Sequence, residues 1–171
     1  QTLLPGQIVL RTLRTQPEIW HAIRSLMVRG APAIGVAAGM AAYLAARDLP
    51  DEGFREGFEA ACAHLATARP TAVNLFWALD RMRACAAQNG LQTVREALCR
   101  ECIAIRDEDE AMCKAIGEHG LALLQPGMGI LTHCNAGMLA AMRYGTALAP
   151  LYLGQQRGYG FKVYADETRP L

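Results

Sequence analysis

The chain has 171 residues, of which 52% are hydrophobic and 19% are charged. This composition supports a sizeable apolar core and excludes a largely disordered protein. The net charge of +1, from 17 basic and 16 acidic residues, argues against nucleic acid as the main partner. The uncharged run 31–46 is too short to span a membrane, and no signal peptide is visible. We therefore expect a cytoplasmic protein with no membrane or nucleic-acid partner.

The first part of the chain is predicted to be mostly helical. A short strand over 7–10 precedes a helix that begins at the capping box Thr15-x-x-Glu18, with Pro17 in its first turn, and that ends near Met27. A small-residue helix over 33–47 suits the centre of a bundle. The next helix, capped by Asp51, carries a core stripe formed by Phe54, Phe58, Ala61, Cys62 and Leu65.

Two further helices complete this part. One begins near residue 73, after a potential cap at Thr71, and ends at Asn89-Gly90. The other is long and begins after Thr93. Its predicted inner face is apolar and consists of Val94, Leu98, Cys102, Ile105, Met112 and Ile116.

Two loops join an arginine to the start of a helix. Arg29 is followed by Gly30-Ala31-Pro32, and Arg69 is followed by Pro70. A helix start offers N–H groups to an anion, and glycine lets the backbone approach a ligand. The two loops could converge on one phosphate, although each one alone is also typical of an ordinary interhelical loop.

The last part of the chain predicts a βαβ unit, with strands over 129–132 and 161–165 and a helix over 138–147. The expected fold class is α/β, with a mostly helical N-terminal domain over 1–126 followed by the start of an open parallel sheet over 127–171. A parallel sheet must be covered on both faces, so this domain is expected to be incomplete and the chain truncated.

Cys134 follows the first of these strands and precedes the predicted helix. A thiol at a helix start ionises more easily, which would make Cys134 a candidate nucleophile or proton-transfer group. The alternative is a small buried cysteine that only packs beneath the helix. His133 is expected to point to the opposite side of the strand and to pack there.

The other cysteines indicate reduced thiols rather than a metal site. Cys99-x-x-Cys102 lies within a predicted helix, and Cys113 and His119 do not complete a common zinc spacing. We expect neither a metal nor a cofactor.

Five motifs in order resemble those of the methylthioribose-1-phosphate isomerase family, whose superfamily also contains ribose-1,5-bisphosphate isomerase and regulatory subunits of a translation-initiation exchange factor. The resemblance covers almost the whole chain. The motifs are Val28-Arg29-Gly30-Ala31-Pro32-Ala33-Ile34-Gly35, Arg69-Pro70-Thr71-Ala72-Val73-Asn74-Leu75, Leu131-Thr132-His133-Cys134-Asn135-Ala136-Gly137, Tyr144-Gly145-Thr146-Ala147 and Val163-Tyr164-Ala165-Asp166-Glu167-Thr168-Arg169-Pro170.

The resemblance implies that Arg29, Gly30, Ala31 and Arg69 hold a sugar phosphate and that Cys134 is the catalytic cysteine. It implies a helical N-terminal domain followed by a Rossmann-like C-terminal domain, which begins at residue 127. It also implies an aldose–ketose isomerase of methionine salvage, acting as a homodimer on 5-methylthioribose 1-phosphate. The family's catalytic aspartate falls beyond Leu171, so the chain alone is expected to be inactive. A non-catalytic regulatory member that binds a sugar phosphate, or an isomerase of a related 5-deoxypentose or ribose phosphate, is the alternative.

Overall fold

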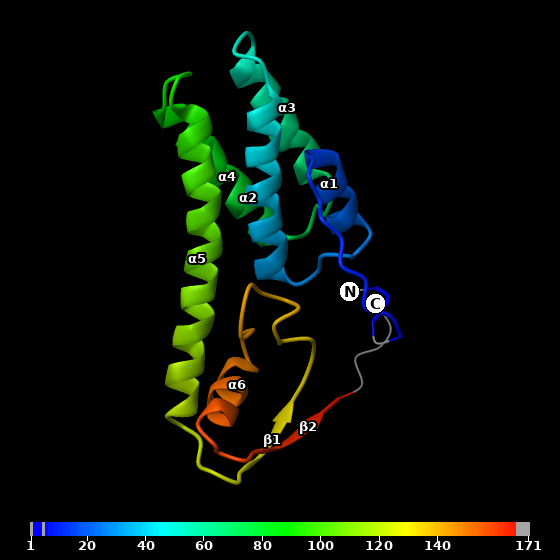
Figure 1. Ribbon diagram of the computed structural model, residues 1–171, viewed down its shortest axis with the longest axis vertical. Coiled ribbons are helices and arrows are strands. Elements are labelled where there is room, and N and C mark those ends of the chain that lie inside the picture. Colours follow the sequence, from blue (N-terminus) through cyan, green and yellow to red (C-terminus); the bar gives the residue numbers. More distant parts are fainter. Residues whose placement is uncertain (1, 5, 167–171) are drawn as a thin grey trace. The chain divides into compact units, whose positions relative to one another are not determined.

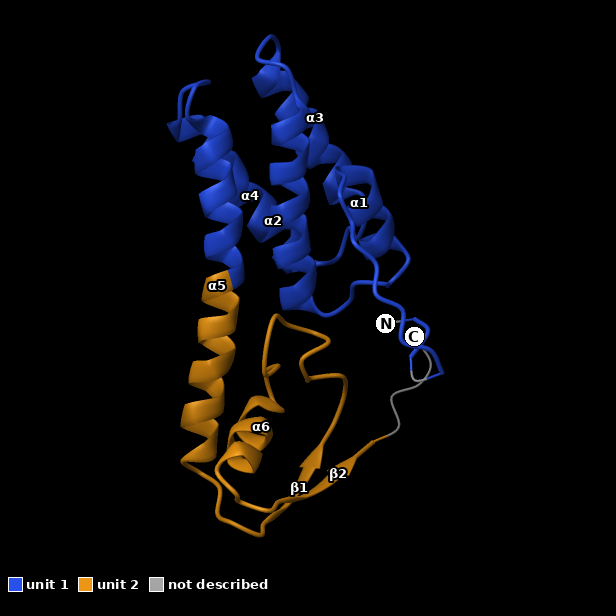
Figure 2. Ribbon diagram, in the orientation of Figure 1, with its two compact units in different colours: residues 1–106 blue, residues 107–171 orange. Residues whose placement is uncertain are grey.

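The computed structural model describes residues 2–4 and 6–166 and divides into two compact units (Figures 1 and 2). Unit 1 comprises residues 1–106 and unit 2 comprises residues 107–171, so that the division falls within the long helix α5 (Val94–Leu121). The predicted domain boundary after residue 126 stays a prediction. Among the described residues, no helix is both long and apolar enough to cross a membrane.

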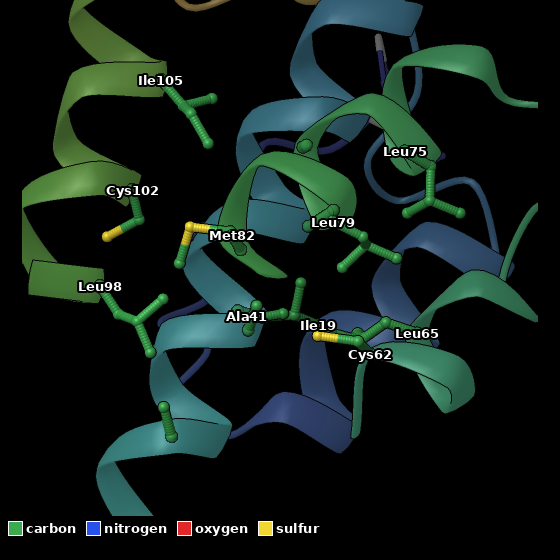
Figure 3. Packing of buried hydrophobic residues seen from close by; sticks show 14 of the residues in the cluster. Ile19, Ala41, Cys62, Leu65, Leu75, Leu79, Met82, Leu98, Cys102 and Ile105 are labelled. Carbon is green, nitrogen blue, oxygen red and sulfur yellow. The ribbon is translucent and has the colours of Figure 1, made fainter. Parts of the chain in front are cut away.

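Unit 1 is a helical bundle built around α2 (Ala31–Asp48), as the small-residue pattern predicted. This helix packs against α1 (Gln16–Arg24), α3 (Phe54–Ala66) and α4 (Val73–Gln88). Alanine side chains let neighbouring helices approach closely, and several alanines of α2 are fully buried. Figure 3 shows the surrounding core, to which α1, α3, α4 and the first part of α5 contribute Ile19, Cys62, Leu65, Leu75, Leu79, Met82, Leu98, Cys102 and Ile105.

The predicted capping box at the start of α1 is confirmed. The Thr15 hydroxyl accepts a bond from the Glu18 N–H at 3.4 Å, and the Glu18 carboxylate accepts one from the Thr15 N–H at 3.1 Å. The helix ends at Arg24, before the predicted end at Met27. The Ser25 hydroxyl bonds the His21 carbonyl at 2.7 Å, and Leu26 adopts a φ of 61°, which no helix continues through.

Three local predictions in unit 1 are wrong. Residues 7–10 form no strand, since no partner strand among the described residues bonds them, and Leu10 is 94% exposed. Helix α3 begins after Gly53, whose φ is 69°, and the Asp51 carboxylate instead bonds Arg95 at 2.7 Å. Ala72, rather than Thr71, precedes α4, and no side chain caps that helix.

The inner face of α5 changes along the helix. Val94, Leu98, Cys102 and Ile105 are buried as predicted, whereas Met112 and Ile116 are exposed. The buried residues in the unit 2 part of the helix are Cys113, Gly117 and Leu121. A Cβ at Gly117 would lie 2.6 Å from Leu153 of α6 (Ala149–Gln156). Glycine at this position therefore permits the close approach of α6 to α5, and the face of α5 that α6 covers is not the predicted one.

Unit 2 contains the predicted βαβ unit. Strands β1 (Gly129–Thr132) and β2 (Lys162–Ala165) pair in parallel, with Thr132 opposite Ala165, and α6 connects them. The fold class is therefore α/β, with a helical N-terminal part followed by the start of a parallel sheet. Strand β1 is not a buried strand in this structure, because Leu131 is 71% exposed.

The predicted helix over 138–147 is also wrong. Its residues form turns, and the helix begins only at Ala149. The segment closes on itself, because the Thr146 N–H bonds the Ala136 carbonyl at 3.0 Å. Positive φ values at Tyr144 (63°) and Gly145 (79°) are incompatible with a continuous helix there. Local contacts of the loop thus override the helix propensity of its apolar residues.

Candidate functional site

The first part of the candidate site lies in unit 1, where Arg29, Gly30 and Ala31 lead into α2. Gly30 is the residue that precedes the helix, with φ 93° and ψ 133°, a conformation that strains any residue with a side chain. Gly30 has no side chain with which to cap α2, and the first turn of the helix contains no acidic residue. The half-buried Arg29 therefore stands at a helix start whose partial positive charge is not neutralised by the helix itself.

The second part is built in the same way at the start of α4. Arg69 is half-buried, and its carbonyl accepts a bond from the Ala72 N–H at 3.0 Å, which closes the turn into the helix. This helix also lacks a side-chain cap and an acidic residue in its first turn. By contrast, α1, α3 and α5 carry Glu18, Glu56 and Glu96 in their first turns.

These two helix starts lie against one another. A Cβ placed at Gly35, in the second turn of α2, would stand only 3.0 Å from the carbonyl oxygen of Asn74, in the first turn of α4. The two arginine loops, which are 40 residues apart in the sequence, therefore lead into adjacent helix N-termini (Figure 1). Such an arrangement suits an anion, because the N–H groups of two helix starts lie near one end of the bundle and an arginine precedes each helix.

A separate candidate residue lies in unit 2, where Cys134 follows β1 in an exposed turn. Its φ is 65°, a left-handed conformation that is uncommon for a residue other than glycine. The prediction that Cys134 stands at a helix start is wrong, because α6 begins only at Ala149. The alternative of a buried packing cysteine is wrong as well, since the Cys134 side chain is exposed.

Burial separates Cys134 from other cysteines of the chain. Burial raises the pKa of the Cys62 thiol to about 12 and that of the Cys102 thiol to about 11. The Cys102 thiol is engaged within α5, where it bonds the Cys99 carbonyl at 3.2 Å. In the part of the chain that the structure describes, no cluster of three or more histidine, cysteine or acidic side chains could hold a metal ion. Cys134 is thus the cysteine that combines exposure with a place beside the sheet.

His133 does not pack as predicted. Its side chain is 81% exposed, and its Nδ1 lies 2.6 Å from a carboxylate oxygen of Asp166. These two residues directly follow β1 and β2, whose last residues, Thr132 and Ala165, are paired. Sequence reasoning missed this pair, although the parallel register of the two predicted strands could have placed the two residues side by side. Ligands bind at the carboxyl ends of the strands in open α/β sheets, which is where the pair lies.

Comparison with known proteins identifies the family of this chain. The model of the Initiation factor 2 subunit family matches residues 27–171. The chain belongs to this family. Its members include proteins of more than one function, as the relatives below show, so the family alone does not fix the activity.

The similar curated proteins carry the names of two different isomerases. The chain is 58% identical to a methylthioribose-1-phosphate isomerase of Symbiobacterium thermophilum, covering 100% of this chain and 49% of that protein. It is 55% identical to a 5-deoxyribose 1-phosphate isomerase of Moorella thermoacetica, covering 100% of this chain and 50% of that protein. The chain thus spans about half the length of these curated relatives.

Two solved structures share the fold. The 5-methylthioribose 1-phosphate isomerase of Pyrococcus horikoshii superposes with a TM-score of 0.88 at 31% identity, over 95% of this chain and 55% of that one. The translation initiation factor eIF-2B, subunit delta, from A. fulgidus superposes with a TM-score of 0.90 at 37% identity, over 99% of this chain and 51% of that one.

Proposed function

We propose that the protein to which this chain belongs is an aldose–ketose isomerase that converts 5-methylthioribose 1-phosphate into 5-methylthioribulose 1-phosphate in methionine salvage. The observation that carries the proposal is the identity of 58% with a methylthioribose-1-phosphate isomerase along the whole chain. The paired arginine loops and the exposed Cys134 support it, because they supply the two kinds of group that the reaction requires.

The phosphate is bound but not transferred in this reaction, so the protein must hold it without attacking it. Arg29 and Arg69 suit this role, since guanidinium groups bind phosphate oxygens through paired, charge-assisted hydrogen bonds. The backbone at Gly30 and Ala31 adds donors from the start of α2. A firmly held phosphate contributes orientation at the reacting carbons, which are C1 and C2 of the same sugar.

The chemical step moves one hydrogen from C2 to C1 after the sugar ring opens, with no net oxidation. In one form, a base removes the C2 proton, an enediol forms, and the proton returns at C1. In the other, the C2 hydrogen shifts directly to C1 as a hydride. We propose that Cys134 acts beside C1 and C2, while an acid/base group elsewhere in the protein serves the sugar oxygens. The exposed thiol at the carboxyl end of β1 supports this assignment.

The direct test is a comparison of substrates with the full-length protein. We expect the largest kcat/KM with 5-methylthioribose 1-phosphate, measured by the appearance of the C2 ketone in the 13C NMR spectrum. Ribose 1-phosphate, which keeps the phosphate and lacks the apolar C5 substituent, is the matched control. A higher kcat/KM with ribose 1-phosphate than with the methylthio sugar would overturn the proposed substrate.

The second candidate is an isomerase of 5-deoxyribose 1-phosphate, which the 55% identity with the Moorella thermoacetica protein of that name favours. The two sugars differ only in the C5 substituent, and the arginine loops would bind the phosphate of either. Including 5-deoxyribose 1-phosphate in the same assay separates these candidates by the ratio of their kcat/KM values.

The third candidate is a non-catalytic regulatory protein that binds a sugar phosphate, which the structural likeness to the A. fulgidus subunit favours. Binding of 5-methylthioribose 1-phosphate without any turnover would support it. The presence of Cys134 together with both arginine loops supports the enzyme instead, because a protein that only binds the phosphate has no need of the thiol.

We further propose that the full-length protein is a cytoplasmic homodimer whose C-terminal domain is Rossmann-like. The parallel pairing of β1 and β2 through α6 supports the proposed domain, since this connection is the usual unit of such folds. Sedimentation analysis of the full-length protein tests the dimer, and a monomer at micromolar concentration would contradict it.

A further inference from the structure

The residues on either side of Cys134 explain how its conformation can be held. A non-glycine residue with a φ of 65° occupies a sparsely populated backbone region, and such conformations persist only where surrounding contacts fix them. On the C-terminal side, the Ala136 carbonyl accepts a bond from the Thr146 N–H at 3.0 Å. On the N-terminal side, Cys134 is preceded by His133, whose ring is bonded to Asp166.

The His133–Asp166 pair ties together the ends of the two strands. The Asp166 N–H bonds the Thr132 carbonyl at 3.4 Å, which extends the backbone ladder by one step beyond β2. A side-chain bond of 2.6 Å between His133 Nδ1 and Asp166 Oδ2 then joins the residue that follows β1 to the residue that follows β2. Backbone and side chain together thus fix the chain up to the residue that immediately precedes Cys134.

We propose that His133 and Asp166 form a positioning pair that fixes the direction in which the Cys134 side chain leaves the sheet edge. The carboxylate of Asp166 orients the imidazole through Nδ1, and the oriented imidazole in turn holds the turn into Cys134. The pair does not transfer the substrate's proton. Both side chains are largely exposed, at 81% and 51%, so the fold of unit 2 does not depend on their burial and they can be replaced without removing core contacts.

The test uses the full-length protein and five variants. His133→Ala and Asp166→Ala each remove the pair, and the double variant removes both groups. His133→Asn keeps a donor near the position of Nδ1 but has no titratable ring. Arg157→Ala is the matched control, because it removes a partly exposed ion pair with Glu118, elsewhere in unit 2. For its kinetic readout this inference rests on the proposed isomerase activity.

We expect His133→Ala and Asp166→Ala to lower kcat by roughly 10-fold to 100-fold with little change in KM, as small misplacements of reacting groups do. The double variant should be no worse than either single variant, because the two residues act as one unit. His133→Asn should recover most of the lost rate, and Arg157→Ala should leave kcat unchanged. Unchanged kcat in both alanine variants would overturn the inference, as would multiplicative losses in the double variant. A His133→Asn variant as slow as His133→Ala would assign proton transfer, not positioning, to the ring.

A second readout does not depend on the substrate. The rate at which iodoacetamide alkylates Cys134, followed by peptide mass spectrometry, should change at least threefold in His133→Ala and return toward the original rate in His133→Asn. If the unaltered protein isomerises none of the three sugar phosphates, the proposed function fails. In that case the alkylation rates by themselves test the positioning role of the pair, and equal rates in all variants would overturn it.

Discussion

The close crossing of α2 and α4 can be tested by a single methyl group. In Gly35→Ala the new Cβ would lie 3.0 Å from the Asn74 carbonyl oxygen and 3.3 Å from the Asn74 Cβ. These atoms belong to the backbone and the first side-chain carbon of a helix, so they cannot rotate away. Overpacking of this kind costs about 1–3 kcal/mol, whereas replacing a helical glycine by alanine gains about 1 kcal/mol. We therefore expect a net loss of about 1 kcal/mol in the free energy of unfolding.

Gly57→Ala is the matched control, since it makes the same replacement inside α3. There the new Cβ would meet Leu49 Cδ2 at 2.8 Å, but this atom is the end of a flexible side chain that can turn aside. We expect Gly57→Ala to be neutral or to stabilise by up to about 1 kcal/mol. Urea unfolding of both variants in the full-length protein measures the difference.

The substitution at the crossing of α2 and α4 should also change ligand binding, whereas the control substitution should not. Moving α2 away from α4 separates the loops that carry Arg29 and Arg69, so Gly35→Ala should also weaken binding of the sugar phosphate, measured by calorimetry, while Gly57→Ala should not. Equal stabilities of the two variants would refute the packing argument. Equal affinities would refute the claim that the crossing aligns one phosphate site.

Three further predictions concern the phosphate site, the buried thiol and the chain itself. Arg29→Ala and Arg69→Ala should each raise KM by roughly 10-fold to 100-fold, because each removes a charge-assisted hydrogen bond of about 1.5–3 kcal/mol. Arg100→Ala, on the exposed surface of α5, should not change KM in the same steady-state assay, and a KM unchanged by either loop variant would exclude that arginine from the site. The raised pKa of Cys62 means that the unfolded thiol ionises first, so its contribution to stability is constant below about pH 9 and falls above it. Between pH 8 and about pH 10.5 the unfolding free energy should fall by roughly 2 kcal/mol more in the unaltered protein than in Cys62→Ala, in which Cys102 still titrates, and equal losses in both proteins would contradict this. The isolated 171-residue chain should give no turnover of 5-methylthioribose 1-phosphate by NMR, and appreciable ketone formation would show that it carries a whole active site.

Helical periodicity and capping chemistry were sufficient to predict most of unit 1. The Thr15-x-x-Glu18 box and the spacing of Phe54 and Phe58 act within one or two helical turns, so neighbouring residues determine them. Asp51 shows the limit of such reasoning. It has the chemistry of a cap, but a distant guanidinium, that of Arg95, binds its carboxylate instead.

The turn after β1 could not be predicted from local propensity. Residues 138–144 are good helix formers, yet the loop closes through the Thr146 bond to Ala136 and through positive φ values near Gly145. The same non-local cause hid the contact of His133 with Asp166. Alternation along a strand assigns a side to that residue, but only the pairing of two strands distant in sequence brings it to Asp166.

The positions of the candidate residues in the chain follow from the sequence, whereas the packing around them does not. The arginine loops were recognised from their own residues, but their adjacency depends on the packing of Gly35 against Asn74. The place of Cys134 after a strand follows from the sequence, but no helix start stands beside it, because α6 begins only at Ala149.

Replacement of Cys134 by serine in the full-length protein tests the central claim most directly. Serine keeps the size and the turn but has no thiol, and the phosphate loops lie in unit 1, apart from the substitution in the sequence. We expect turnover of 5-methylthioribose 1-phosphate to fall by at least a thousandfold, while calorimetry shows binding within threefold of the unaltered protein. Turnover at the original rate would contradict the assignment of Cys134 to the reaction.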